Sequence, residues 1–273
     1  MLALGVGLTP PIQFSRKCRS SRGGFGVWAD GFPSFLPKEV EEIKDPFARK
    51  LAKRIERLPV QLQVGMSEKC IMSSCVKPLL ETEKNPVVLL HGFDSSCLEW
   101  RYAYPLLEEA GLETWAVDIL GWGFSDLERL PSCDVGHVAS KRNHLCQFWR
   151  SYIKKPMILV GPSLGAAVAI DFAVNHSEAV KQLVLIDASV YTKGTGDQTK
   201  LPRIVSYAGV KQETLIIWGE DDQIISSKLA VRLQCELPNA IVRQIPDCGH
   251  IPHVEKPDPV AKLIVDFIRG SSC

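Results

Sequence analysis

A serine within a glycine-flanked turn, Gly161-Pro162-Ser163-Leu164-Gly165, is the feature that most constrains how this chain folds. An apolar run at 157–160 precedes the turn, and small residues at 166–170 follow it. This pattern predicts a buried strand, a sharp turn and a helix, with Ser163 at the tip of the turn. Glycines flank the serine because a Cβ there would collide with neighbouring backbone. The turn presents the Ser163 hydroxyl beside the unpaired N–H groups that begin the helix.

Strands and helices alternate along the rest of the chain. Continuous apolar runs at 86–90 and 114–118 are typical of strands buried on both faces of a parallel sheet. Further runs predict strands at 60–64, 70–76, 182–187, 213–218 and 240–245, and helices at 98–110, 142–152, 228–237 and 259–268. The alternation predicts an α/β fold with a mostly parallel, doubly wound sheet.

An additional amphipathic helix is predicted at 39–58, ahead of the sheet. Apolar residues recur there at a spacing close to four and define one helical face: Ile43, Phe47, Leu51, Ile55 and Leu58. We expect this N-terminal helical extension, within residues 30–59, to dock on the surface of a main domain that spans 60–270.

The N-terminal residues have a composition of their own. Residues 1–29 contain four basic residues, three serines and no acidic residue. Such leaders are typical of organelle transit peptides, although a disordered basic tail would look similar. We expect a transit peptide for the chloroplast, with mitochondrion or cytoplasm as alternatives, and a mature chain that begins near Ala29.

Composition excludes several classes of protein. The 273 residues balance 32 basic against 31 acidic side chains, and no basic cluster is interleaved with aromatics, which argues against nucleic-acid binding. No apolar run approaches the roughly 18 residues of a membrane span. The nine cysteines show no metal-ligand spacing and favour free thiols, with a regulatory Cys70–Cys75 disulfide as the alternative. No cofactor or metal motif is present.

Chemistry-bearing residues cluster where the predicted strands end, which is where ligands bind in such sheets. In chain order they are His91-Gly92-Phe93, Asp118, Ser163, Asp187, Asp221-Asp222 and Gly249-His250. A serine hydroxyl is a poor nucleophile at neutral pH, so an imidazole must accept its proton and a carboxylate must orient the imidazole. The order Ser…Asp…His provides these three groups.

Five motifs in order resemble the α/β-hydrolase fold over about residues 60–270. They are Leu90-His91-Gly92-Phe93, Asp118-x-x-Gly121-x-Gly123-x-Ser125, Gly161-x-Ser163-x-Gly165, Gly219-x-x-Asp222 and Gly249-His250. The chain looks like a plant plastid-type member of the branch that contains epoxide hydrolases, haloalkane dehalogenases, C–C bond hydrolases and small esterases. The resemblance implies Ser163 as nucleophile, Asp222 as acid and His250 as base. It also implies that the backbone N–H groups of Phe93 and Leu164 bind the oxyanion.

The serine at the nucleophile position argues against epoxide hydrolase and haloalkane dehalogenase activity, because those enzymes carry an aspartate at that position. Acyl transfer through an acyl-enzyme fits better, and we expect a small carboxylic ester or thioester as substrate. A non-catalytic, receptor-like binding protein is the alternative from another class.

Several assignments have alternatives. His253 lies close to His250, which we prefer because it directly follows Gly249 after the last strand. Asp187 is the second choice for the acid. Trp100 and Trp122 could line the acyl pocket or simply pack in the core. His91 and Asp118 are expected to organise loops.

The stretch where relatives carry a helical cap domain is short. Such caps hold about 60–100 residues, and insertions of that length are usually functional. Here only residues 188–212 separate two predicted strands, enough for one helix at about 201–208. The chain is therefore either a naturally lidless hydrolase or, as we favour, a shortened form of a capped one, with a seam near Val210-Lys211. An inactive shortened product is a further alternative.

Overall fold

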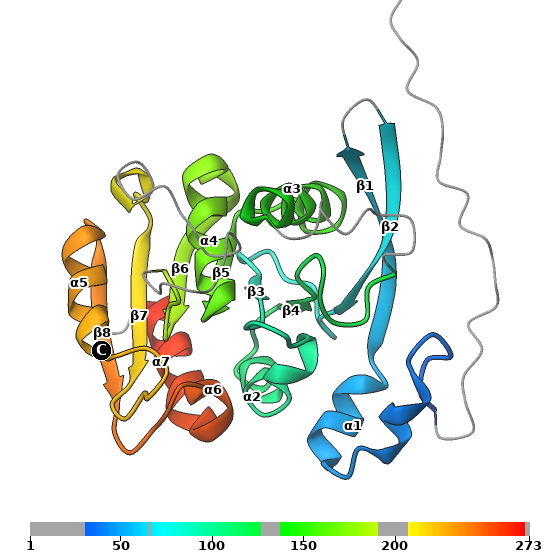
Figure 1. Cartoon of the computed structure of the whole chain (residues 1–273), viewed down its shortest axis with the longest axis horizontal. Helices are drawn as coiled ribbons and strands as arrows, with labels where there is room; N and C mark the ends of the chain where they lie inside the picture. The colour runs from blue at the N-terminus through cyan, green and yellow to red at the C-terminus, as the bar shows by residue number, and fades with distance from the viewer. Residues whose placement is uncertain (1–30, 65–66, 127–136, 191–206, 271–273) are drawn as a thin grey trace, which may run out of the picture.

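The computed structural model of the protein describes residues 31–64, 67–126, 137–190 and 207–270 (Figure 1). Eight strands form one sheet in the order β1-β2-β4-β3-β5-β6-β7-β8. Strands β3 to β8 pair in parallel, whereas β1 and β2 form an antiparallel hairpin at one edge. The strands are β1 (Ile55–Val64), β2 (Ser67–Val76), β3 (Val87–Leu89), β4 (Thr114–Val117), β5 (Met157–Pro162), β6 (Val180–Ile186), β7 (Glu213–Gly219) and β8 (Ala240–Ile245). The predicted mostly parallel α/β sheet is confirmed.

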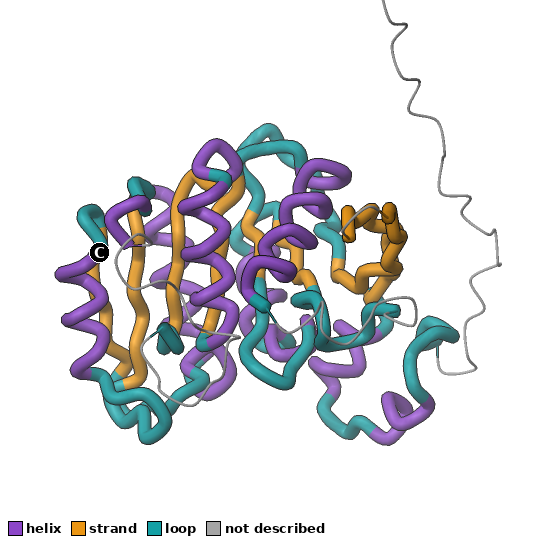
Figure 2. The backbone as a smooth tube through the Cα atoms, turned by 45° about the horizontal axis from the view of Figure 1, so that its top comes forward, coloured by secondary structure: helices purple, strands orange, loops and turns teal. Residues whose placement is uncertain are grey.

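Helices cover both faces of this sheet (Figure 2). One apolar core lies under α3 (Val138–Phe148), α4 (Leu164–Asn175) and α5 (Lys228–Glu236). A second core, on the opposite face, lies under α1 (Pro46–Ala52), α2 (Ala103–Glu109) and α7 (Pro257–Arg269). Every residue of β3, β4 and β5 is buried, because helices pack on both sides of these central strands.

Short helical turns complete the described part of the chain. They are η1 (Lys38–Glu42), η2 (Cys97–Trp100), η4 (Trp149–Ile153), η5 (Ser177–Ala179), η7 (Tyr207–Gly209) and the four-residue α6 (Pro252–Glu255). Two of these turns, η2 and α6, pack against each other beside the carboxyl ends of the strands. None of the helices in the described ranges is long and apolar enough to cross a membrane.

The prediction of one helix at 39–58 is wrong. The segment divides into η1, α1 and the first residues of β1. Asp45 caps α1 by accepting hydrogen bonds from the N–H groups of Phe47 and Ala48, and Pro46 occupies the first helical position. Ile55 begins β1, whose ten residues all pair with β2, and this long ladder outweighs the helical spacing. Phe47 is 50% exposed rather than part of a buried face.

The structure excludes the alternative of a Cys70–Cys75 disulfide, and other predicted segments lie wholly or partly outside the described residues. Cys70 and Cys75 both lie on β2, opposite Gln61 and Glu56 of β1, so they cannot meet across two strands. Residues 1–29 and most of the predicted 201–208 helix lie outside the described residues. Of the short stretch between β6 and β7, the structure describes 187–190 and 207–212, including η7.

Candidate active site

Ser163 occupies a strained turn between β5 and α4. Its backbone angles are φ 47° and ψ −113°, a region that costs a non-glycine residue about 1–3 kcal/mol. Two backbone hydrogen bonds hold this conformation: Ser163 N donates to Ile186 O (2.9 Å), and Ser189 N donates to Ser163 O (3.2 Å). The turn predicted from the sequence is therefore present, and neighbouring strand β6 maintains its strain.

The two flanking glycines are required by close backbone contacts. A Cβ on Gly161 would lie 2.3 Å from the carbonyl oxygen of Gly165, and a Cβ on Gly165 would lie 2.7 Å from the carbonyl oxygen of His91. Real Cβ atoms do not approach backbone oxygens so closely. The same contacts show that the serine turn packs directly against the loop that follows β3.

His250 and Asp222 form a hydrogen-bonded pair beyond the ends of β7 and β8. The distance from His250 Nδ1 to Asp222 Oδ2 is 2.8 Å. Asp222 Oδ1 accepts hydrogen bonds from the N–H groups of Ile224 and Ile225. Burial would raise the pKa of Asp222, but these hydrogen bonds and the His250 imidazole hold it below its ordinary value. Because an ionised Asp222 accepts from Nδ1–H, His250 Nε2 keeps a lone pair that can take a proton.

Ser163 is not hydrogen-bonded to His250 in the described part of the structure. Such hydrogen bonds are often long in unliganded enzymes and tighten when substrate binds. Ser163 does lie next to the loop after β3, because a Cβ on Gly92 would be 3.8 Å from Ser163 Cβ.

His91 orients the peptide that carries the predicted oxyanion donor Phe93. His91 Nε2 lies 2.9 Å from Ile119 N and accepts its hydrogen, so Nδ1 carries the ring proton and donates to Gly92 O at 2.8 Å. In a trans peptide the C=O and N–H bonds point in opposite directions, so the Phe93 N–H faces away from His91. Among the described residues, neither the Phe93 N–H nor the Leu164 N–H that begins α4 has a protein acceptor. Both donors are available to an incoming oxygen.

Asp187 lies beside this pair in surroundings that favour its protonated form. Its Oδ1 accepts a hydrogen bond from Gly219 N (3.0 Å), and its buried Oδ2 has no partner within the described ranges. Burial, with the nearby Asp222 charge, raises the pKa of Asp187 to about 9 against the opposing Gly219 hydrogen bond. Asp187, Asp222 and His250 bring polar atoms within 4.8 Å of one another. A neutral Asp187 cannot balance an imidazolium charge, so Asp222 is the better placed of the two acids.

Asp118 organises the glycine-rich loop after β4, as expected. The fully buried carboxylate accepts hydrogen bonds from Ser74 Oγ, Cys97 N and Phe124 N. A Cβ on Gly123 would come within 2.2 Å of this carboxylate, which explains the glycine.

The two tryptophans have different surroundings. Trp100 is fully buried, donates from Nε1 to Leu90 O and packs against His253, so its contacts in this structure are those of a packing residue. Trp122 is half-buried and contacts the ring of Phe93, with centroids 4.8 Å apart. Trp122 is the more exposed of the two, and a substrate contact for either tryptophan stays a prediction.

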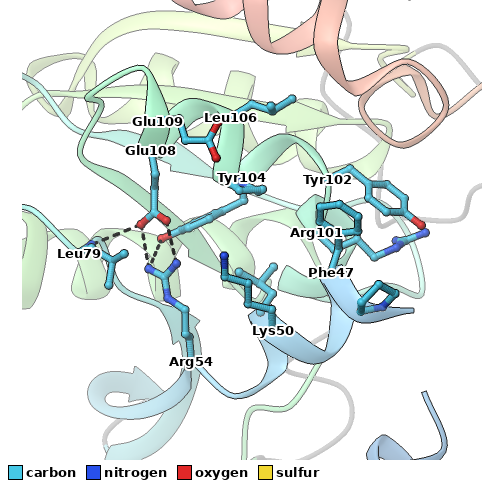
Figure 3. Close-up of a pocket in the computed structure, with 13 residues that line it drawn as sticks. Phe47, Lys50, Arg54, Leu79, Arg101, Tyr102, Tyr104, Leu106, Glu108 and Glu109 are labelled. Carbon is cyan, nitrogen blue, oxygen red and sulfur yellow. Dashed lines mark hydrogen bonds and ion pairs between the residues drawn. The ribbon is translucent and has the colours of Figure 1, made fainter. Parts of the chain in front are cut away.

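Two pockets in the described part of the structure differ in how close they lie to the candidate site. A groove of about 790 Å³ borders the candidate site and is lined by Phe93, Glu99 and Ile251 among others. A cavity of about 390 Å³ lies between α1 and α2, where Arg54 forms an ion pair with Glu108 (Figure 3). None of the predicted catalytic residues lines the second cavity.

The sequence did not indicate Glu99 or Glu255, which both reach backbone N–H groups of the site. Glu99 accepts from Gly92 N, and Glu255 accepts from Gly249 N. Each is a single acidic residue among many, and only its position next to a site motif could have drawn attention to it.

The chain belongs to the α/β-hydrolase family of enzymes. The family described as serine aminopeptidase, S33, matches residues 81–208, and the family described as alpha/beta hydrolase fold matches residues 191–257. The "Alpha/beta hydrolase domain-containing protein VTE7" of Arabidopsis thaliana is 49% identical, with 96% of each chain covered. That alignment extends over 325 positions, 52 more than the 273 residues here, so the relative contains at least 52 residues without a counterpart.

More distant proteins share the fold. The human "Putative protein-lysine deacylase ABHD14B" is 26% identical, with 67% of this chain and 83% of the relative covered. Among solved structures, a thermophilic esterase from Thermogutta terrifontis matches with a TM-score of 0.67 at 17% identity, covering 80% of this chain and all of the esterase. A meta-cleavage product hydrolase from Pseudomonas fluorescens matches with a TM-score of 0.59 at 20% identity, covering 74% and 95% of the two chains.

Proposed function

We propose that the protein is a serine hydrolase that cleaves a small carboxylic ester or thioester through an acyl-enzyme. Ser163 is the nucleophile, His250 the general base and Asp222 the acid that orients His250. The observation that carries this proposal is the 2.8 Å contact between His250 Nδ1 and an ionised Asp222, which leaves Nε2 as the proton acceptor. The strained turn at Ser163 supports the same reading, since strain of this kind concentrates at functional sites.

The reaction proceeds in two displacements. Ser163 Oγ attacks the carbonyl carbon while His250 Nε2 takes the hydroxyl proton, and the N–H groups of Phe93 and Leu164 bind the resulting oxyanion. Collapse of this intermediate breaks the bond to the alcohol or thiol, which leaves with the proton from His250. Water, deprotonated by His250, then attacks the acyl-enzyme and releases the acid and the Ser163 hydroxyl.

We expect the site of this form to be open compared with a capped hydrolase, because only residues 187–212 lie between β6 and β7. We assign the missing positions of the 325-position alignment to the segment between β6 and β7, because the sheet and the helices on either side are present. Without a cap, water enters the site and the electrostatic stabilisation of the oxyanion weakens. We therefore expect activity on small, activated esters.

The test is hydrolysis of p-nitrophenyl acetate and butyrate, together with labelling by a fluorophosphonate probe. Wild type should hydrolyse the esters and label, and Ser163→Ala should do neither. Equal rates for the two proteins would contradict the enzyme assignment. Stable binding of a small carboxylic acid without probe reaction would favour a receptor, and no reaction with no cooperative thermal unfolding would favour an inactive shortened product.

We also propose that residues 1–29 direct the protein to chloroplasts. The support is compositional, because the segment contains four basic residues and no acidic one. A fluorescent protein fused to residues 1–29 should accumulate in plastids of plant cells. A fusion that stays in the cytoplasm or enters mitochondria would contradict the proposal.

A further inference from the structure

A buried hydrogen bond joins the loop after β3 to the loop after β8. His253 Nε2 lies 2.7 Å from Glu99 Oε1, the His253 side chain is fully buried and the Glu99 side chain is 11% exposed. Glu99 belongs to η2, whereas His253 belongs to α6 and stands three residues beyond His250. The pair thus connects segments that are more than 150 residues apart in the chain.

On one side, Glu99 holds the backbone next to Phe93. Both of its carboxylate oxygens accept the Gly92 N–H, at 3.2 and 3.1 Å. His91 already binds Gly92 O, so both peptide groups of Gly92 are held. Burial would raise the pKa of Glu99, but the hydrogen bond and charge of His253 hold it at about 2, so Glu99 is ionised at neutral pH.

On the other side, α6 holds the backbone around His250. Glu255 accepts the N–H groups of Gly249 (2.8 Å) and Ile251 (3.1 Å), the two neighbours of His250. The ring of His253 packs on Trp100, with centroids 4.5 Å apart. Movement of α6 would therefore be transmitted both to His250 and to Glu99.

We propose that Glu99 and His253 are positioning residues that couple an oxyanion loop (residues 91–93) to a histidine loop (residues 249–251). The hydrogen bond between Glu99 and His253 keeps the Phe93 N–H and the His250 imidazole at a constant separation around Ser163. This inference rests on the proposed serine hydrolase function. Coupling matters because a displacement of about 1 Å at a catalytic group can reduce the rate about a hundredfold.

Three variants separate the contributions of the Glu99 charge, the Glu99–His253 hydrogen bond and the packing of the His253 ring on Trp100. Glu99→Gln keeps the shape and an acceptor for Gly92 N–H but removes the charge. Glu99→Ala removes the link entirely, and His253→Phe keeps a ring against Trp100 but cannot bind Glu99. Glu109→Ala is the matched control, because Glu109 is an exposed glutamate of nearby α2 whose side chain has no hydrogen bond or ion pair with another described residue.

The first measurement compares p-nitrophenyl acetate with its thionoester, whose sulfur is a weak hydrogen-bond acceptor. Glu99→Ala and His253→Phe should lower kcat for the oxoester about 10- to 100-fold, with KM changed less than about threefold. They should also lower the oxoester-to-thionoester rate ratio, while Glu99→Gln recovers most of both and Glu109→Ala matches wild type. An unchanged ratio in Glu99→Ala and His253→Phe would overturn the proposal, even if their activity falls.

The second measurement is hydrogen exchange of backbone amides, which needs no turnover. His253→Phe should accelerate exchange in residues 90–95, and Glu99→Ala should accelerate it in residues 248–256. Acceleration confined to each variant's own segment would overturn the coupling. If Glu99→Ala does not fold, His253→Phe tests the coupling by itself, because it removes the hydrogen bond from the histidine side while exchange is read in residues 90–95, with Glu99→Gln expected to exchange like wild type. A wild type that neither hydrolyses esters nor labels at Ser163 would refute the proposed function, and exchange would still decide the coupling.

Discussion

Replacement of Asp187 by asparagine tests the division of roles between the two buried acids. The pKa of Asp187 is raised to about 9 from an ordinary value of 3.8. At pH 7 the folded protein therefore holds a proton on Asp187 that the unfolded chain releases. Folding then takes up a proton at this group, so the contribution of Asp187 to stability is most favourable below about pH 4 and is lost as pH rises toward 9.

The size of this effect follows from the same values. Between pH 3.8 and pH 7, each pH unit costs about 1.36 kcal/mol, so Asp187 lowers the free energy of unfolding at pH 7 by about 4 kcal/mol. Asparagine is neutral, retains an oxygen for Gly219 N–H and can donate from Nδ2 where the Oδ2 atom lacks a partner. Asp187→Asn should therefore be the more stable protein at neutral pH, and its advantage should grow as pH rises.

Urea unfolding of wild type and Asp187→Asn at pH 5, 7 and 8.5 measures the difference, in which contributions of unrelated groups cancel. The variant should also keep at least about a third of the wild-type kcat. A pH-independent stability difference would show that Asp187 is not protonated in the folded protein. A loss of activity of a hundredfold or more would make Asp187, and not Asp222, the acid.

Three further substitutions have defined outcomes. Asp222→Asn should lower kcat about 10⁴-fold because the His250 tautomer is reversed, and a loss below about tenfold in steady-state kinetics would contradict its role. His91→Ala should lower kcat about 10- to 100-fold by releasing the Phe93 peptide, and should lower the free energy of unfolding by about 1–3 kcal/mol because Ile119 N–H loses its acceptor. Gly161→Ala should destabilise the fold by more than about 3 kcal/mol in urea unfolding, because its Cβ meets Gly165 O at 2.3 Å; a change below about 1 kcal/mol would contradict the contact.

The sheet was predictable because its central strands are apolar throughout. Runs such as 157–160 are buried on both faces and need no periodicity to be recognised. The turn at Ser163 was equally clear, since the contacts of Gly161 and Gly165 tolerate no side chain. Local chemistry alone accounts for these features.

The sequence misled where long-range pairing decides the structure. Apolar residues at 43, 47, 51, 55 and 58 suit a helix, but β1 begins at Ile55 rather than at the predicted residue 60, because all ten of its residues pair with β2. The assignment of the catalytic acid to Asp187 or to Asp222 also depends on contacts between segments far apart in the chain. The answer depends on which of the two carboxylates the loop after β8, which carries His250, places next to the imidazole. Both carboxylates follow strands at the same edge of the sheet, so the sequence alone does not decide between them.

The most direct test of the central claim is to identify the residue that a fluorophosphonate probe modifies. Peptide mapping by mass spectrometry of the labelled protein should place the adduct on Ser163, and Asp222→Asn should slow its formation strongly while Asp187→Asn does not. An adduct on another residue, or no adduct on folded wild-type protein, would contradict the claim that Ser163, His250 and Asp222 form a working catalytic site.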